Sequence, residues 1–185
     1  VRSRGLGDVY KRQPQMGSVR PNVFKKPERI ADSWGRIQIE PFDLKPEDIR
    51  MKRLDFIPFS KAGYNIQEAD IIVAGGRGMG SKENFDKLYE LADAIGGVVG
   101  ATRPLVEKGW IELPYQVGQT GKTVSPKLYL AFGISGAIQH VSGISGADTI
   151  VAINNDPNAE IFQHANYGIV GDCMEVLNDM LAHLK

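Results

Sequence analysis

From residue 69 onward, short apolar runs alternate with amphipathic segments. One such segment begins after Ser81, which can cap a helix, carries its apolar residues on one face, and ends at Gly96. Helical patterns of this kind follow each run, at residues 82–95, 103–108, 136–144, 159–165 and 173–184. The runs predict strands at residues 69–76, 98–102, 127–135, 148–154 and 167–172, and the first is typical of a strand buried on both faces. Strands and helices in alternation predict an α/β fold, a doubly wound, mostly parallel sheet with helices on both faces.

Residues 19–60 have a different pattern. Five prolines, at positions 21, 27, 41, 46 and 58, argue against a helix, and apolar residues predict short strands at 19–24, 36–40 and 49–59. These strands are too few to bury a core of their own. We therefore expect this segment to pack on surface that the chain itself does not supply.

Glycine or polar side chains follow every predicted strand of the second part. In a parallel sheet the carboxyl ends of the strands form one edge, where ligands bind. We therefore expect one rim to bring together Arg77 within the glycine-rich stretch 75–81, the pair Thr102 and Arg103, the pair Ser135 and Gly136, and the single residues Asn154 and Asp172.

Several known binding and catalytic motifs are incomplete in this sequence, because a required residue is missing or the spacing differs. The stretch GQTGKT at 118–123 lacks the first glycine of a Walker A loop, and Pro126 follows where a helix should start. Gly76, Gly78 and Gly80 are one residue short of the dinucleotide fingerprint. Ser135 lacks the flanking glycines of a nucleophile elbow. His164 and His183 have no second ligand at metal spacing, so we expect no metal site.

Composition narrows the class of protein. The 185 residues carry no net charge, and residues 61–185 hold 9 basic against 14 acidic side chains, which argues against a nucleic-acid partner. No apolar run reaches the roughly 18 residues that cross a membrane. The single cysteine, Cys173, opens an amphipathic helix, so we expect it to pack in the core, and it fits a reducing compartment.

Five ordered blocks, at 75–85, 99–110, 116–140, 149–162 and 167–172, resemble the FAD-binding domain of the electron transfer flavoprotein α subunit. Residues 15–24, QMGSVRPNVF, resemble the end of that subunit's first domain. The resemblance implies three parts. Residues 1–13 match nothing in the family and are treated as a non-native or unassigned lead, 14–60 as a remnant of the first domain with a linker, and 61–185 as the FAD-binding domain.

The resemblance also implies a set of FAD-binding residues. Pyrophosphate would lie on Arg77, Thr102 and Ser135, and the adenosine end on Asn154 and Asp172. The loop from Gln116 to Gly121 would wrap the ribityl chain and the flavin ring, with Thr120 near N5, and Arg103 and His140 would lie beside the ring, His140 towards the C2 carbonyl. The implied set is Arg77, Thr102, Arg103, Gln116, Val117, Gly118, Gln119, Thr120, Gly121, Ser135, Gly136, Ala137, Ile138, Gln139, His140, Asn154 and Asp172.

The family implies an electron carrier without substrate chemistry of its own. It would form a heterodimer with a β subunit and pass electrons from dehydrogenases, such as acyl-CoA dehydrogenases, to a quinone reductase, in the bacterial cytoplasm or the mitochondrial matrix. Some bacterial relatives instead bifurcate electrons from NADH. Two other classes stay open on the residues alone, an NAD(P)- or CoA-binding enzyme domain and a non-redox nucleotide-binding module. Flavin absorbance of the purified protein distinguishes them.

Overall fold

The structure is a computed structural model. It describes residues 65–184 without a gap, together with scattered positions nearer the start of the chain, residues 28, 35–39, 41, 45, 47, 49, 51, 52, 54 and 55. The continuous part and the scattered positions belong largely to separate compact units. Each is described by itself.

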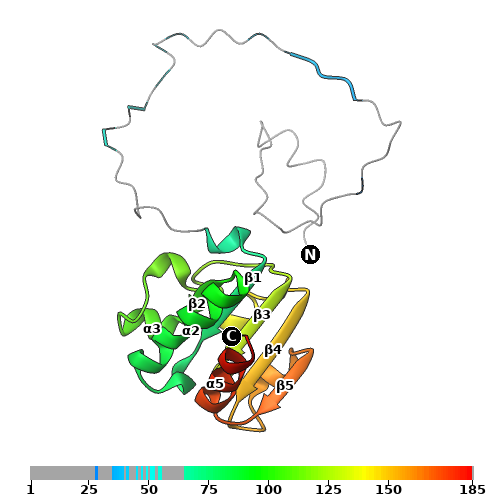
Figure 1. The fold of residues 1–185 in the computed structure, drawn as a ribbon. Helices are drawn as coiled ribbons and strands as arrows, with labels where there is room; N and C mark the ends of the chain where they lie inside the picture. The colour runs from blue at the N-terminus through cyan, green and yellow to red at the C-terminus, as the bar shows by residue number, and fades with distance from the viewer. Residues whose placement is uncertain are drawn as a thin grey trace, which may run out of the picture. The chain divides into compact units, whose positions relative to one another are not determined.

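Residues 65–184 form one five-stranded, all-parallel sheet (Figure 1). Its strands are β1 (Ile71–Gly75), β2 (Val98–Ala101), β3 (Leu128–Phe132), β4 (Thr149–Asn154) and β5 (Tyr167–Val170). Their spatial order is β2-β1-β3-β4-β5, so the order along the chain reverses between β1 and β3. The predicted α/β fold with a parallel sheet is confirmed, and all five strands lie where the apolar runs predict them.

Different elements pack on the two faces of the sheet. On one face, Val73 and Leu130 pack with the helices α2 (Lys82–Ile95), α3 (Arg103–Glu107) and α5 (Cys173–His183), and α2 and α5 lie side by side in Figure 1. On the other face, alternate residues such as Tyr129 pack under the short helix α4 (Ile138–Val141) and the loop that precedes β3. Cys173 is buried in the first layer, as its sequence position predicts.

One element differs from the sequence prediction. Residues 159–165 form a 3-10 turn, η5 (Glu160–Gln163), where the pattern predicts a helix, because the start of β5 at Tyr167 leaves room for little more than one turn. Strand β5 lies at one edge of the sheet beside β4, and all four of its residues are exposed. The remaining short elements are η2 (Ile66–Glu68), η3 (Arg77–Met79) and η4 (Leu113–Tyr115).

The scattered positions do not form the strands that the pattern predicts. Residues 35–39 have no regular structure, and Ile37 is 89% exposed. The described positions within 49–59 are likewise in no strand. The predicted strand at 19–24 lies outside the described residues. The exposed apolar side chains of this segment are Ile37, Ile39, Ile49, Met51 and Leu54.

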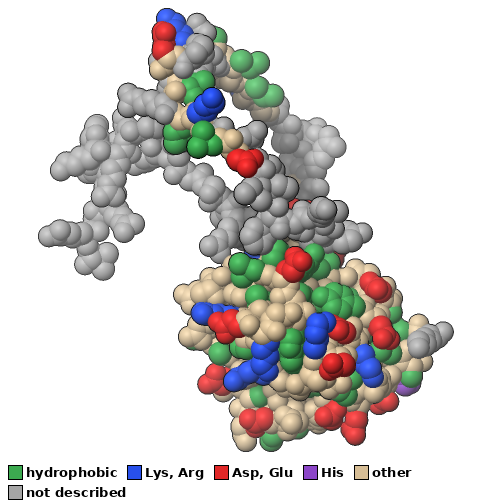
Figure 2. Space-filling model, turned by 90° about the vertical axis from the view of Figure 1, so that its left-hand side faces the viewer, with side chains coloured by type: hydrophobic (Ala, Val, Ile, Leu, Met, Phe, Trp, Pro, Cys, Tyr) green, Lys and Arg blue, Asp and Glu red, His purple; other side chains and the backbone are tan. Residues whose placement is uncertain are grey.

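Surface charge on the domain is mixed. On the face shown in Figure 2, Lys and Arg side chains lie among Asp and Glu side chains. Within the residues that the structure describes, no helix is long and apolar enough to cross a membrane.

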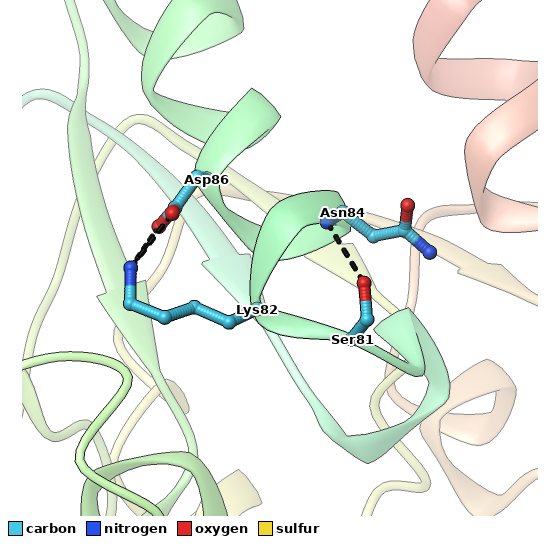
Figure 3. A network of polar contacts seen from close by, with 4 residues as sticks. All are labelled: Ser81, Lys82, Asn84 and Asp86. Atoms are coloured by element: carbon cyan, nitrogen blue, oxygen red, sulfur yellow. Dashed lines mark hydrogen bonds and ion pairs between the residues drawn. The ribbon is translucent and has the colours of Figure 1, made fainter.

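Helix α2 begins and ends as its sequence predicts. The Ser81 Oγ accepts a hydrogen bond of 3.3 Å from the Asn84 backbone N–H, and Gly96 ends the helix in the left-handed conformation with φ of 70°. One turn along the exposed side, Lys82 Nζ lies 2.7 Å from a carboxylate oxygen of Asp86 (Figure 3). Both contacts lie in the first turns of the helix. The cap gives a backbone N–H its hydrogen-bond acceptor, whereas the ion pair joins two half-exposed side chains.

That difference gives a testable contrast. Ser81→Ala should lower the free energy of unfolding by about 1 kcal/mol, because the N–H of Asn84 loses its acceptor. Lys82→Ala should lower it by less than about 0.5 kcal/mol, because exposed ion pairs contribute little. Urea denaturation of the full chain measures both. Equal effects would show that the cap adds no more than a surface ion pair.

Candidate functional site

A cavity of about 780 Å³ opens at the carboxyl ends of the strands, where β1 and β3 lie side by side. Its volume is typical of cofactor pockets, and the reversal of strand order is where open α/β sheets bind ligands. The loops after β1, β2, β3 and β4 all line it, together with the loop around Gly118. Eleven of the residues predicted for the site line this cavity, namely Arg77, Thr102, Arg103, Val117, Gly118, Thr120, Ser135, Ala137, Gln139, His140 and Asn154.

Glycines let two of these loops touch through their backbones. The Gly78 N–H donates to the Gly133 carbonyl at 2.9 Å, and a Cβ on Gly78 would lie only 2.6 Å from the Gly133 Cα. Gly133 has φ of 61°, and its own added Cβ would lie 2.7 Å from the Gly78 Cα. Side chains at either position would push the loops apart. Where these two loops meet, only backbone atoms line the cavity.

Three hydrogen-bond donors face the cavity without a partner in the described part of the chain. The Arg77 side chain is exposed and makes no ion pair there. Thr102 is 9% exposed and does not cap α3, so the capping role that its position allows is not the one it has. The Ser135 hydroxyl is also unbonded, while its carbonyl accepts from the Ile161 N–H at 3.0 Å. One guanidinium and two hydroxyls suit a phosphate-bearing ligand.

Arg103 lies at the cavity but has a partner of its own. Its Nε is 2.7 Å from the Glu107 Oε1, one turn along α3. The two side chains are 63% and 59% exposed, so water screens the pair. Arg103 can therefore still present charge to a ligand, though less than an unpaired arginine would.

The loop of residues 116–122 is held by its own hydrogen bonds. The Gln116 Nε2 donates to the Thr120 Oγ1 at 3.0 Å, and the Lys122 N–H donates to the Gln116 carbonyl at 2.7 Å. A Cβ on Gly121 would collide with that same carbonyl. The loop turns back within a few residues and leads into no helix. Its sequence resembles a phosphate-binding loop, but its structure does not. Gln116, Gln119 and Gly121 do not line the cavity.

His140 is buried, and both ring nitrogens have partners within the protein. Nδ1 lies 3.1 Å from the Val117 carbonyl oxygen, and Nε2 lies 2.9 Å from the Tyr129 hydroxyl. Burial lowers the pKa of His140 from 6.5 to about 4, although the bond to Val117 opposes the shift. The ring is therefore neutral at pH 7, and it borders the cavity with its nitrogens already bonded.

The part of the cavity that the segment after β4 lines is acidic and rich in amides. Asn154 lines it, and its Nδ2 donates to the Ile134 carbonyl at 2.9 Å. Asp172 does not line it, because its carboxylate caps α5 by accepting from the N–H groups of Met174 and Glu175. Gly136 and Ile138 also lie outside the lining.

Sequence reasoning missed two acidic residues of this part, Asp156 and Glu160. The Asn, Asp and Pro cluster after β4 signals a turn, which the structure has, since the Asp156 N–H donates to the Asn154 Oδ1 at 3.0 Å. That turn carries the acidic side chains to the rim. Among the described residues, no three His, Cys, Asp or Glu side chains gather as they would around a metal ion.

Residues 65–145 match the family model of the electron transfer flavoprotein FAD-binding domain. Among curated proteins, the chain is 51% identical over 174 residues to the electron transfer flavoprotein subunit alpha of Thermoanaerobacterium thermosaccharolyticum, which covers 94% of this chain and 53% of that protein. Over 94% of its length the chain is thus similar to an electron transfer flavoprotein alpha subunit. The family resemblance seen in the sequence is thereby confirmed.

Two other relatives match over a similar extent. Protein FixB of Clostridium saccharobutylicum is 52% identical over 175 residues, covering 94% of this chain and 52% of that protein. Protein FixB of Azotobacter vinelandii is 54% identical over 170 residues, covering 91% and 47%. The chain thus spans about half the length of these electron transfer flavoprotein relatives. The cofactor named by the matched family model is FAD, as the resemblance implies.

The buried state of His140 predicts a dependence of stability on pH. An unfolded histidine binds its proton below about pH 6.5, whereas His140 in the folded chain binds it only below about pH 4. Between these values the unfolded state holds more protons, so stability falls as pH falls, by at most about 3 kcal/mol. Urea denaturation from pH 7.5 to 4.5 should show this loss, and His140→Gln should flatten it.

His183 provides the control, because it is exposed near the end of α5. His183→Gln should keep the wild-type slope of stability against pH. If His140→Gln kept it as well, the acid sensitivity of the chain would come from other groups.

Proposed function

We propose that the chain is an electron-carrier subunit that binds FAD in the cavity at the β1/β3 junction. The observation that carries this proposal is the lining itself. Loops from four strands converge on about 780 Å³, with unbonded donors on Arg77, Thr102 and Ser135 and with amides and carboxylates from the segment after β4. A dinucleotide needs both kinds of group, donors for its pyrophosphate and acceptors for its adenosine.

The donors fit the parts of FAD one by one. Arg77, Thr102 and Ser135 would hold the pyrophosphate, since their polar groups are free of internal partners in the described residues. The glycine contact between the loops after β1 and β3 lets a charged group approach backbone N–H groups closely. Asn154 with Asp156 or Glu160 supplies acceptors for a ribose or an adenine amine. When bound, FAD supplies the one- and two-electron chemistry that the chain's own side chains lack.

The partners that we propose for the whole protein are those that the family resemblance implies. We propose a heterodimer with a β subunit, electrons received from dehydrogenases and passed to a quinone reductase, and a cytoplasmic location. Residues 14–60 would be the remnant of the first domain and its linker. Exposed apolar side chains such as Ile37 and Met51 support this, because they are surface that another domain or subunit would cover.

Flavin titration tests the cofactor. The full chain should bind FAD at least about tenfold more tightly than FMN, because FMN lacks the adenosine that the residues after β4 would hold, and each added factor of ten needs only about 1.4 kcal/mol. Quenching of flavin fluorescence measures both affinities. Arg77→Ala should weaken FAD about tenfold by removing a charge-assisted hydrogen bond, and should leave riboflavin, which has no phosphate, unaffected.

The outcomes separate the candidate classes. Equal binding of FAD and FMN would mean that no residue grips an adenosine. Tight binding of NAD(P)H or coenzyme A without flavin binding would assign the cavity to an enzyme domain instead.

Arg103 should raise the reduction potential of bound FAD, because its charge favours the more negative reduced ring. A charge-assisted hydrogen bond contributes about 1.5–3 kcal/mol, and for one electron about 1.4 kcal/mol equals roughly 60 mV. Since Glu107 and water screen Arg103, we expect Arg103→Ala to lower the first potential by the lower end of that range, about 60 mV. Spectroelectrochemistry of the FAD-loaded chain measures the shift.

Two matched variants control this experiment. Glu107→Gln should move the potential in the opposite direction, because it removes the carboxylate that neutralises Arg103. Lys82→Ala breaks an ion pair of the same spacing that lies outside the cavity lining, and should leave the potential unchanged. A shift of equal size in Lys82→Ala would reduce the Arg103 effect to one of net charge.

A further inference from the structure

Gln116 carries a buried amide that bonds to a residue lining the cavity. Gln116 itself is only 4% exposed and does not line the cavity. Its Nε2 donates to the Thr120 Oγ1 at 3.0 Å, and Thr120 does line the cavity. A leucine or a methionine would fill a buried position of this size without a polar group to satisfy. Packing alone therefore does not explain the amide.

The backbone of Gln116 is fixed on the sheet. Gln116 pairs with Ala101, the last residue of β2, in an isolated parallel bridge, and the Val117 N–H donates to the Ala101 carbonyl at 2.9 Å. The Lys122 N–H donates to the Gln116 carbonyl at 2.7 Å, and a Cβ on Gly121 would lie 2.9 Å from the Gln116 Cγ. The side chain of Gln116 therefore starts from a firm support and is packed along its stem.

Thr120, four residues further along the loop, has less to hold it. The residue is exposed, and within the described part of the chain the bond from Gln116 is the hydrogen bond that its hydroxyl makes. Exposed side chains change rotamer within picoseconds to nanoseconds unless a contact holds them. The bond from the firmly supported Gln116 is such a contact.

The direction of this bond decides what the hydroxyl can do next. A hydroxyl can accept one hydrogen bond and donate another, whereas an amide N–H can only donate. The Thr120 Oγ1 accepts from the Gln116 Nε2, so it keeps its own hydrogen. That hydrogen is available to an acceptor atom on the cavity side.

We propose that Gln116 is a positioning residue of the candidate site. Its amide holds the Thr120 side chain in one rotamer and leaves the Thr120 O–H to donate to an acceptor atom of the ligand. Thr120 would contact the ligand, and Gln116 acts only through it. The ligand contact rests on the proposed function, in which the ligand is FAD, but the rotamer of Thr120 does not.

The rotamer can be measured without flavin. Three-bond couplings from the Thr120 Cγ2 to the backbone nitrogen and carbonyl carbon report χ1, in NMR spectra of the full chain labelled with ¹³C and ¹⁵N. In the wild type they should fit one staggered rotamer. In Gln116→Met, which keeps the length of the side chain but has no donor, they should fit an average over rotamers.

Gln163→Met is the matched control, because it makes the same change at an exposed glutamine outside the cavity lining. It should leave the Thr120 couplings at their wild-type values. An averaged rotamer in the wild type, or a single fixed rotamer in Gln116→Met, would overturn the proposal.

The direction of the bond is tested at the Gln116 amide, in variants that leave Gln116 in place. In Thr120→Val the Nε2 proton loses its acceptor, so its resonance should move upfield. Thr120→Ser keeps the hydroxyl and should keep the resonance near its wild-type position. Thr120 is exposed, so both variants should fold. An unmoved resonance in Thr120→Val would show that the amide does not donate to the hydroxyl, and the proposal would be wrong.

Flavin titration tests the link to the ligand. Gln116→Met and Thr120→Val should each weaken FAD binding about threefold to tenfold, the range of one hydrogen bond, and Thr120→Ser should retain most of the affinity. The double variant should bind FAD no more weakly than Thr120→Val alone, because Gln116 acts through the hydroxyl.

Two results of the titration would count against the proposal. Additive losses would mean that Gln116 acts on the site by another route, and wild-type affinity in Thr120→Val would mean that the hydroxyl does not reach the ligand. If the wild type bound no FAD, the proposed function would fail, while the couplings and the amide resonance would still judge whether Gln116 positions Thr120.

Discussion

The backbone contact between Gly78 and Gly133 is the constraint on which the site depends. It joins the loops that follow β1 and β3, the two strands where the spatial order of the sheet reverses. With no side chain between the loops, the cavity reaches the strand ends and exposes backbone there. Arg77 lies next to Gly78 and Ser135 lies two residues after Gly133, and both line the cavity. Placement of the donors is thus a consequence of close packing between two short loops.

The segment around α4 holds another part of the site in place. It seats the 116–122 loop by one side-chain bond from His140, by a backbone bond from Gln139 and by close approach at Gly143. The helix has only four residues, so its own propensity contributes little, and burial of Val141 and Ile144 against the sheet holds it. The wall of the site and the core beneath it are therefore one packed unit. This explains how a short helix with little intrinsic stability can position a loop.

The fold could be predicted from the sequence because its signals are local. Helix α2 has its cap, its apolar face and its terminal glycine within sixteen residues, and the buried strands are continuous apolar runs. The site could be predicted only in part. Asp172 follows a strand, as rim residues do, but its carboxylate is used by the next helix, whereas Asp156 reaches the rim from a turn. The partners of His140 lie 11 and 23 positions away, so no local pattern reveals them.

Strand order also bears on how the chain folds. Strand β1 pairs with β2, which follows it closely in sequence. Its other neighbour, β3, is separated from it in sequence by β2, α3 and the 116–122 loop. Contacts between distant parts of a chain form at a cost in loop-closure entropy and slow the folding of parallel sheets. The junction of β1 with β3 is also where the cavity lies. A chain that has folded only its first β-α-β unit carries the loops after β1 and β2 but not those after β3 and β4, so the cavity is complete only when β3 and β4 have joined the sheet.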